Sequence, residues 1–153
     1  MPRMRFNHME LTVPTGVLGQ HRGEIAHFYT ELFGWEALDV PILKQLGLLL
    51  RSDPETSQFL LVTESATPLV SPGYDHLGLL YESRAEVDAL GEQCFKAAAK
   101  DPRVRVKEYE DLVQGPVTVH AFYVRFLLPI WFDVQCLEYA EGALPAERWR
   151  YGA

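Results

Sequence analysis

The sequence has few cysteines and no cysteine motif. Cys94 and Cys136 are its only two, so it has neither a disulfide framework nor a C-x-x-C metal knuckle. The stretch from Met1 to Leu11 carries no apolar core followed by a cleavage pattern, which argues against a secretory signal. We therefore expect two reduced thiols in a cytoplasmic protein.

Long apolar runs and a surplus of positive charge are also missing. The longest apolar stretches, near Leu46–Leu50 and Phe126–Phe132, are far too short to cross a bilayer. Fourteen basic against 21 acidic residues give a net charge of −7, which argues against nucleic acid and anionic membranes as partners. No nucleophile elbow, phosphate loop or nucleotide fingerprint occurs. The 153 residues suit one compact domain.

Two segments of the chain resemble each other and carry histidine at the same place. Residues 7–13 read NHMELTV and residues 75–81 read DHLGLLY, so His8 and His76 each stand second in a short apolar-rich strand. An internal repeat of this kind predicts two related halves. If the halves pack about a pseudo-twofold axis, the two imidazoles converge and form part of a metal site.

Hydrophobic periodicity predicts the elements of the first half. Residues 6–13 alternate, which indicates a strand with one apolar and one polar face. From about His21 to Phe33 the apolar residues recur at helical spacing, and Gly34 follows as a helix stop. Three strands are then expected at about 36–40, 46–51 and 58–63.

A Pro/Ser/Gly-rich joint, residues 66–73, separates the second half, which repeats this order. A strand is expected at 74–81, and Ser83 to Glu86 form a capping box that begins a helix ending near Pro102. Further strands are expected at about 103–108, 116–126 and 131–139. Each half thus has the order β-α-β-β-β: module one spans about 4–65, module two about 74–140, and residues 141–153 form a polar tail.

Three motifs make the chain resemble the vicinal oxygen chelate superfamily, which contains glyoxalase I, extradiol dioxygenases, fosfomycin-resistance proteins and bleomycin-resistance proteins. They are NHMEL at 7–11, HFYTELFGWE at 27–36 and YDHLGL at 74–79. The resemblance covers about residues 4–141. It implies an α+β fold in which two βαβββ modules, related by a pseudo-twofold axis, form a half-open cup from their sheets.

The resemblance also implies a metal centre inside the cup. His8 and His76 match the family's first-strand histidines, and Glu138 matches its last-strand glutamate. The family's Asp-Pro-Asp-Gly-Asn type of turn before that glutamate is replaced here by Leu127 to Trp131. Neutral imidazole binds several divalent ions. We expect Fe²⁺ at this site, with Ni²⁺, Zn²⁺, Mn²⁺ and Co²⁺ as alternatives.

Two further residues are candidates for catalysis. Glu64 ends the last strand of module one: it is either a fourth ligand, as in glyoxalase I, or a solvated residue that leaves a three-ligand centre of the iron oxygenase type. His120 is the candidate acid–base group, because a hairpin turn centred on Pro129 sets it opposite Glu138. An error of one residue in that register moves it to the other face.

Residues that share faces with these candidates are expected to bind the substrate. Glu10 and Thr12 lie on the face of His8, and Phe122 and Val124 form an apolar wall. The expected activity is that of a divalent-metal-dependent enzyme on a small substrate with adjacent oxygens, either dioxygenase-like or glyoxalase-like. The alternative is a small-molecule-sequestering protein of the bleomycin-resistance type without catalysis. The exposed edges of a half-open cup also predict a homodimer.

Overall fold

The computed structural model describes residues 4–147. The first half contains one helix and four strands, namely β1 (His8–Pro14), α1 (Val17–Phe33), β2 (Glu36–Ile42), β3 (Gln45–Arg51) and β4 (Phe59–Ser65). The second half contains one helix and five strands, namely β5 (His76–Leu80), α2 (Arg84–Lys100), β6 (Arg105–Glu108), β7 (Leu112–Gln114), β8 (Val117–Arg125) and β9 (Trp131–Tyr139). The sequence predicted every one of these elements except the short strand β7.

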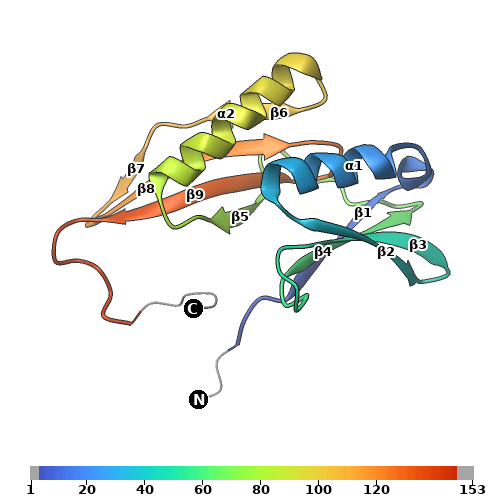
Figure 1. Ribbon diagram of the computed structural model, residues 1–153, viewed down its shortest axis with the longest axis horizontal. Helices are drawn as coiled ribbons and strands as arrows, with labels where there is room; N and C mark the ends of the chain where they lie inside the picture. Colours follow the sequence, from blue (N-terminus) through green and yellow to red (C-terminus); the bar gives the residue numbers. More distant parts are fainter. Residues whose placement is uncertain (1–3, 148–153) are drawn as a thin grey trace.

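The strands form two mixed sheets that repeat one arrangement. The first sheet has the order β1-β4-β3-β2, and the second has the order β5-β9-β8-β6 with β7 beside β8. In each sheet the first strand of the half pairs parallel with the last one, β1 with β4 and β5 with β9. Both helices lie on the same side of the sheets and contact each other (Figure 1). The fold is thus α+β, as the sequence predicts.

Helix boundaries follow from local capping. Helix α2 begins after Ser83, whose hydroxyl accepts a hydrogen bond from the backbone N–H of Glu86, so the predicted N-cap is confirmed. Helix α1 begins at Val17 rather than near His21, because Gly16 takes a positive φ of 93° that allows the chain to turn directly from β1 into the helix. Gly34 ends α1 in a left-handed conformation.

The core lies between the helices and the sheet faces beneath them. Leu11 and Val13 of β1 and Phe132, Val134 and Cys136 of β9 are almost completely buried on that side. Alternation along each strand places the intervening residues on the opposite face, which the two helices do not cover. We call these opposite faces the open faces.

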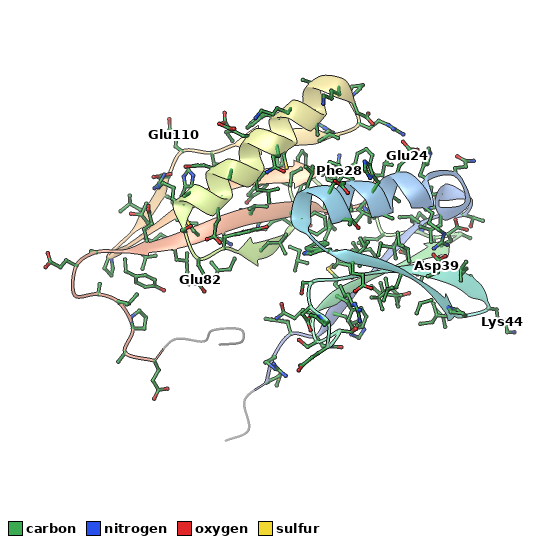
Figure 2. All side chains as sticks on the ribbon, in the orientation of Figure 1. Glu24, Phe28, Asp39, Lys44, Glu82 and Glu110 are labelled. Atoms are coloured by element: carbon green, nitrogen blue, oxygen red, sulfur yellow. The ribbon has the colours of Figure 1, made fainter. Side chains whose placement is uncertain are left out.

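Aromatic rings from α1 reach the second sheet and join the halves. The ring of Tyr29 lies edge-on to Phe132 at 5.5 Å, and its hydroxyl donates to the carbonyl of Phe126 at 3.1 Å. Phe28, labelled in Figure 2, packs on Phe126 with ring centroids 4.5 Å apart. The position of the second sheet therefore depends on the first helix.

The chain after β9 passes beneath the second sheet (Figure 1). Pro145 and Glu147 contribute to the lining of a small cavity there, together with Leu80, Leu137 and Tyr139. Within residues 4–147, no helix is long and apolar enough to span a bilayer.

Candidate functional site

A buried carboxylate on the open face of the second sheet is the most unusual polar group of the structure. Asp133 of β9 is only 7% exposed, and its buried Oδ1 atom has no hydrogen-bond partner among residues 4–147. Its Oδ2 atom lies 3.6 Å from Nε2 of His76 on the neighbouring strand β5. Burial raises the pKa of Asp133, and His76 only partly opposes this. A native fold rarely leaves such a group unsatisfied unless it has a function.

The imidazole of His76 is held in one tautomer. Its Nδ1 atom lies 3.0 Å from the carbonyl oxygen of Tyr74. A carbonyl only accepts, so Nδ1 carries the proton, and in the neutral ring Nε2 presents its lone pair toward Asp133. The ring also packs on Tyr123 at 4.8 Å, which fixes its orientation.

His8 on the open face of the first sheet has the same arrangement. Its Nδ1 atom lies 2.7 Å from Oδ1 of Asn7, whose Nδ2 donates to the carbonyl of Ser57 at 2.8 Å. The amide is therefore oriented with its oxygen toward the ring, so Nδ1 of His8 donates. Phe59 stacks on the imidazole at 4.7 Å. No residue within 4–147 forms a hydrogen bond with Nε2 of His8, which leaves this nitrogen available for a ligand.

The structure does not bring the three predicted metal ligands together in one chain. Among residues 4–147, no group of three His, Cys, Asp or Glu side chains is placed to hold a metal ion. Glu138 shares the helix-side face of β9 with Val134 and Cys136, whereas His76 lies on the open face. Arg84 of α2 pairs with Glu138, donates to both of its oxygens and lowers its pKa.

The β8–β9 hairpin is shifted from the predicted register. His120 pairs with Cys136, and Glu138 pairs with Thr118, so the two are not opposite each other as predicted. The turn is centred one residue earlier than Pro129, and Leu127 there takes a positive φ of 54°. The shift is two positions in the partner strand, so His120 and Glu138 still share a face, which is the one that α2 covers.

Glu64 lies at the N-terminus of α1 and not in an open face. Its Oε1 accepts a hydrogen bond from the backbone N–H of Leu18 at 2.7 Å. The backbone N–H of Gly16, together with those of Leu18 and Gly19, lowers the pKa of Glu64. The carboxylate therefore takes the place of a missing N-cap side chain, and this explains its position at a strand end.

The predicted substrate-binding residues divide between the two faces. Glu10 accepts from the hydroxyl of Thr63 at 2.7 Å, and Thr12 accepts from the backbone N–H of Leu69, both on the open side of β1. Phe122 and Val124 lie instead beneath α2, and Val124 is completely buried. The even-numbered residues of β8 face helix α2, so Phe122 and Val124 belong to the core. They do not form a wall of the open face.

His120 belongs to a charged network between α2 and the second sheet. Its Nε2 atom lies 2.7 Å from Asp88, and its Nδ1 atom lies 2.7 Å from Asp111. Burial disfavours the imidazolium, but the hydrogen bonds to Asp111 and Asp88 raise the pKa of His120 overall. Arg84, and then His120, hold the pKa of Asp111 at about 2.

His120 and Asp88 of this network line a groove of about 530 Å³ on the helix side of the second sheet. Phe122 and Gly91 contribute apolar lining, and Asp88, Glu92 and Glu110 add carboxylates. Figure 2 shows Glu110 beside α2, on the chain that leads to β7. The acid–base candidate His120 thus lies in a different place from His76 and Asp133.

Basic and aromatic side chains surround Asp133 on the open face. Register places Arg105 and Lys107 of β6 on the same face as Tyr123 and Arg125 of β8. The Lys107 ammonium lies over the ring of Tyr74 at 3.9 Å. We call this set, Tyr74, Arg105, Lys107, Tyr123, Arg125 and Trp131, the basic–aromatic face.

Comparison with solved structures identifies the fold. A protein assigned to the glyoxalase family from Bacillus anthracis matches with a TM-score of 0.62 and 16% identity, covering 90% of this chain and 98% of that one. The chain has the vicinal oxygen chelate fold. The fosfomycin resistance protein FosX from Listeria monocytogenes matches with a TM-score of 0.61 and 18% identity, covering 88% of this chain and 91% of FosX.

A third structure with the vicinal oxygen chelate fold is a lactoylglutathione lyase from Agrobacterium tumefaciens. It matches with a TM-score of 0.54 and 15% identity, over 88% of this chain and 95% of that one. No family model and no curated protein sequence matches the chain. The comparisons thus support the fold, while the chemistry has to be argued from the residues.

Sequence reasoning overlooked Asp133 as a site residue, although a signal was present. Asp133 is flanked by apolar residues within a buried strand, and it lies two positions from Gln135 on the same face. A carboxylate inside such a run is costly to bury without a partner or a ligand. The family resemblance points instead to Glu138, near the end of the strand, which lies on the opposite face.

Replacing Asp133 by Asn should stabilise the fold at neutral pH. The raised pKa of Asp133 means that the folded state binds its proton more tightly than the unfolded state does. The stability of the fold therefore falls as the pH rises from the pKa of Asp133 in the unfolded state through its pKa in the folded state. The variant has no carboxyl group at this position and does not lose this stability. Urea unfolding at several pH values should show Asp133→Asn as more stable at pH 7, with the difference shrinking in acid.

Glu138→Gln is the matched control, for which the expected change in stability at neutral pH has the opposite sign. The pKa of Glu138 is lowered by Arg84, so its carboxylate stabilises the fold at neutral pH, and this contribution is lost as pH falls through the folded pKa. The variant should thus be less stable at pH 7. Equal destabilisation by both substitutions would contradict our assignment of Asp133 as a strained functional carboxyl.

Proposed function

We propose that the protein is a divalent-metal-dependent enzyme acting on a small oxygenated substrate, with His8, His76 and Asp133 as the metal donors. The observation that carries the proposal is common to both histidines: Nδ1 is engaged by a fixed acceptor, and Nε2 is left without a hydrogen bond within residues 4–147. A metal-bound histidine is normally held through its other nitrogen in this way.

The chemistry of the donor set fits such an ion. Two neutral imidazoles and one carboxylate form the ligand set of non-haem iron oxygenases, and they also suit nickel, zinc and manganese. Asp133 supplies the carboxylate in place of Glu138, because it shares the open face with His76 and has an oxygen without a partner in the described part of the chain. When bound, the ion would act as a Lewis acid on a substrate oxygen. His8 lies on a different sheet, so one chain does not complete the set.

We infer that a homodimer completes it. The strands that carry the two histidines, β1 and β5, are both edge strands of their sheets, so each offers unpaired backbone groups to a second chain. Apolar side chains near these edges are exposed, with Phe6 at 96% and Leu80 at 66%. Sedimentation equilibrium should give a dimer mass, and a monomer that still binds metal at full strength would contradict this inference.

The second candidate is a protein that binds its ligand without turnover. The basic–aromatic face favours it, because rings and cations can hold a small molecule without an ion. Metal content distinguishes the two functions. A metal-free protein that still binds a small molecule on this face would support sequestration.

Metal titration tests the first proposal. Chelator-treated protein should bind Fe²⁺, Ni²⁺, Zn²⁺, Mn²⁺ or Co²⁺ at a stoichiometry close to one ion per site. Elemental analysis and calorimetry measure this stoichiometry. His8→Ala, His76→Ala and Asp133→Asn should abolish uptake, and Asn7→Ala should weaken affinity about 10–100-fold, as expected for a residue that orients a ligand. Glu138→Gln should leave affinity unchanged. Uptake that survives Asp133→Asn and is lost in Glu138→Gln would overturn the donor set.

A further inference from the structure

Three cations of the basic–aromatic face lack a counter-charge. Among residues 4–147, Arg105, Lys107 and Arg125 form no ion pair with a carboxylate. In contrast, Arg22, Arg51, Arg84 and Arg103 each have at least one carboxylate partner. Acidic residues outnumber basic ones by 21 to 14, so a scarcity of carboxylates does not explain this. The fold collects unpaired positive charge here against the overall charge of the chain.

Two of the cations also lie close enough to repel each other. Arg105 and Arg125 are directly opposite across the β6–β8 ladder, and both guanidinium groups lie over the ring of Trp131, at 5.5 and 4.8 Å. Burial, and then the charge of Arg105, lower the pKa of Arg125. Like charges directly opposite on a sheet are destabilising. An anion bound between them would remove this cost.

The rings of the face supply a surface for a planar group. The ring of Tyr123 contacts those of Tyr74 and Tyr109, with centroids 6.4 and 4.6 Å apart. Tyr74 is 45% exposed and Tyr109 is 40% exposed. Lys107 lies over both of these rings, at 3.9 and 4.6 Å. Exposed aromatic rings beside unpaired cations match a ligand that has both a ring and a negative charge.

The carboxyl group of Asp133 does not neutralise the cations. Asp133 lies against His76, with Oδ2 3.6 Å from Nε2, and Tyr123 lies opposite it in the sheet. Its buried Oδ1 atom has no hydrogen-bond partner among the residues that the structure describes. A ligand on this face would therefore meet cations at the β6–β8 side and an imidazole–carboxyl pair at the β5–β9 side.

We propose that the ligand of the open face is an aromatic carboxylate, with its carboxylate on Arg105, Lys107 and Arg125 and its ring on Tyr74 and Tyr123. The proposal names the substrate class of the site and so rests on the proposed function. Planar guanidinium groups match a carboxylate in two-point geometry, which favours this anion over a spherical one.

The experiment compares two probes that differ in charge and share a ring system. 2-Naphthoate and the neutral 2-naphthalenemethanol are titrated into the full-length protein by calorimetry at low salt. Naphthoate should bind about tenfold more tightly, the effect expected of one charge-assisted hydrogen bond. Arg105→Gln and Lys107→Gln should each remove most of this difference. The matched control is Lys44→Gln, at the distant β2–β3 turn (Figure 2). This variant should keep the full difference in affinity between the two probes.

The outcomes separate this inference from the proposed function. Equal binding of both probes, weakened alike by Tyr123→Leu, would overturn the anionic ligand while leaving a small-molecule site in place. No binding of either probe would also overturn the inference, and the metal titration then judges the proposed function independently. If a glutamine variant fails to fold, Arg125→Lys takes its place, because it keeps the positive charge but removes the planar guanidinium group. This variant should weaken the binding of naphthoate and leave the binding of the neutral probe unchanged.

Discussion

The strict alternation of side chains along β9 is the constraint on which the arrangement of the molecule depends. Phe132, Val134 and Cys136 point beneath the helices and are almost completely buried. The same alternation sends Trp131 and Asp133 to the opposite face. Because Phe132 packs against Tyr29 of the other half, the register of this one strand fixes both the shared core and the composition of the open face.

This constraint also divides the charges of the second sheet. On the helix side, Arg84 pairs with both Glu138 and Asp111, and His120 lies against Asp88 and Asp111. On the open side, and within residues 4–147, Asp133 lacks a partner for one oxygen, and three cations lack a carboxylate. Satisfied charges hold a fold together, whereas unsatisfied ones destabilise it and are retained where a ligand compensates them. The two faces of one sheet thus have different roles.

Much of the fold could be predicted from the sequence, because local patterns determine it. The repeated strands with His8 and His76, the helix cap at Ser83 and the stop at Gly34 are all local signals, and the structure contains each of them. The position of Glu138 could not be obtained in this way. The residue opposite it across the hairpin depends on a turn whose centre is set by a left-handed Leu127, and no local pattern reveals that conformation.

The most direct test of the account is the titration of the Asp133 carboxyl, followed by carboxyl carbon NMR in the ligand-free protein. Our account predicts that this resonance titrates above the ordinary pKa of 3.8, while those of Asp111 and Glu138 titrate below their ordinary values. A carboxyl at position 133 that titrates at or below its ordinary pKa would mean that it is solvated or paired. This result would contradict the assignment of the open face as the functional site.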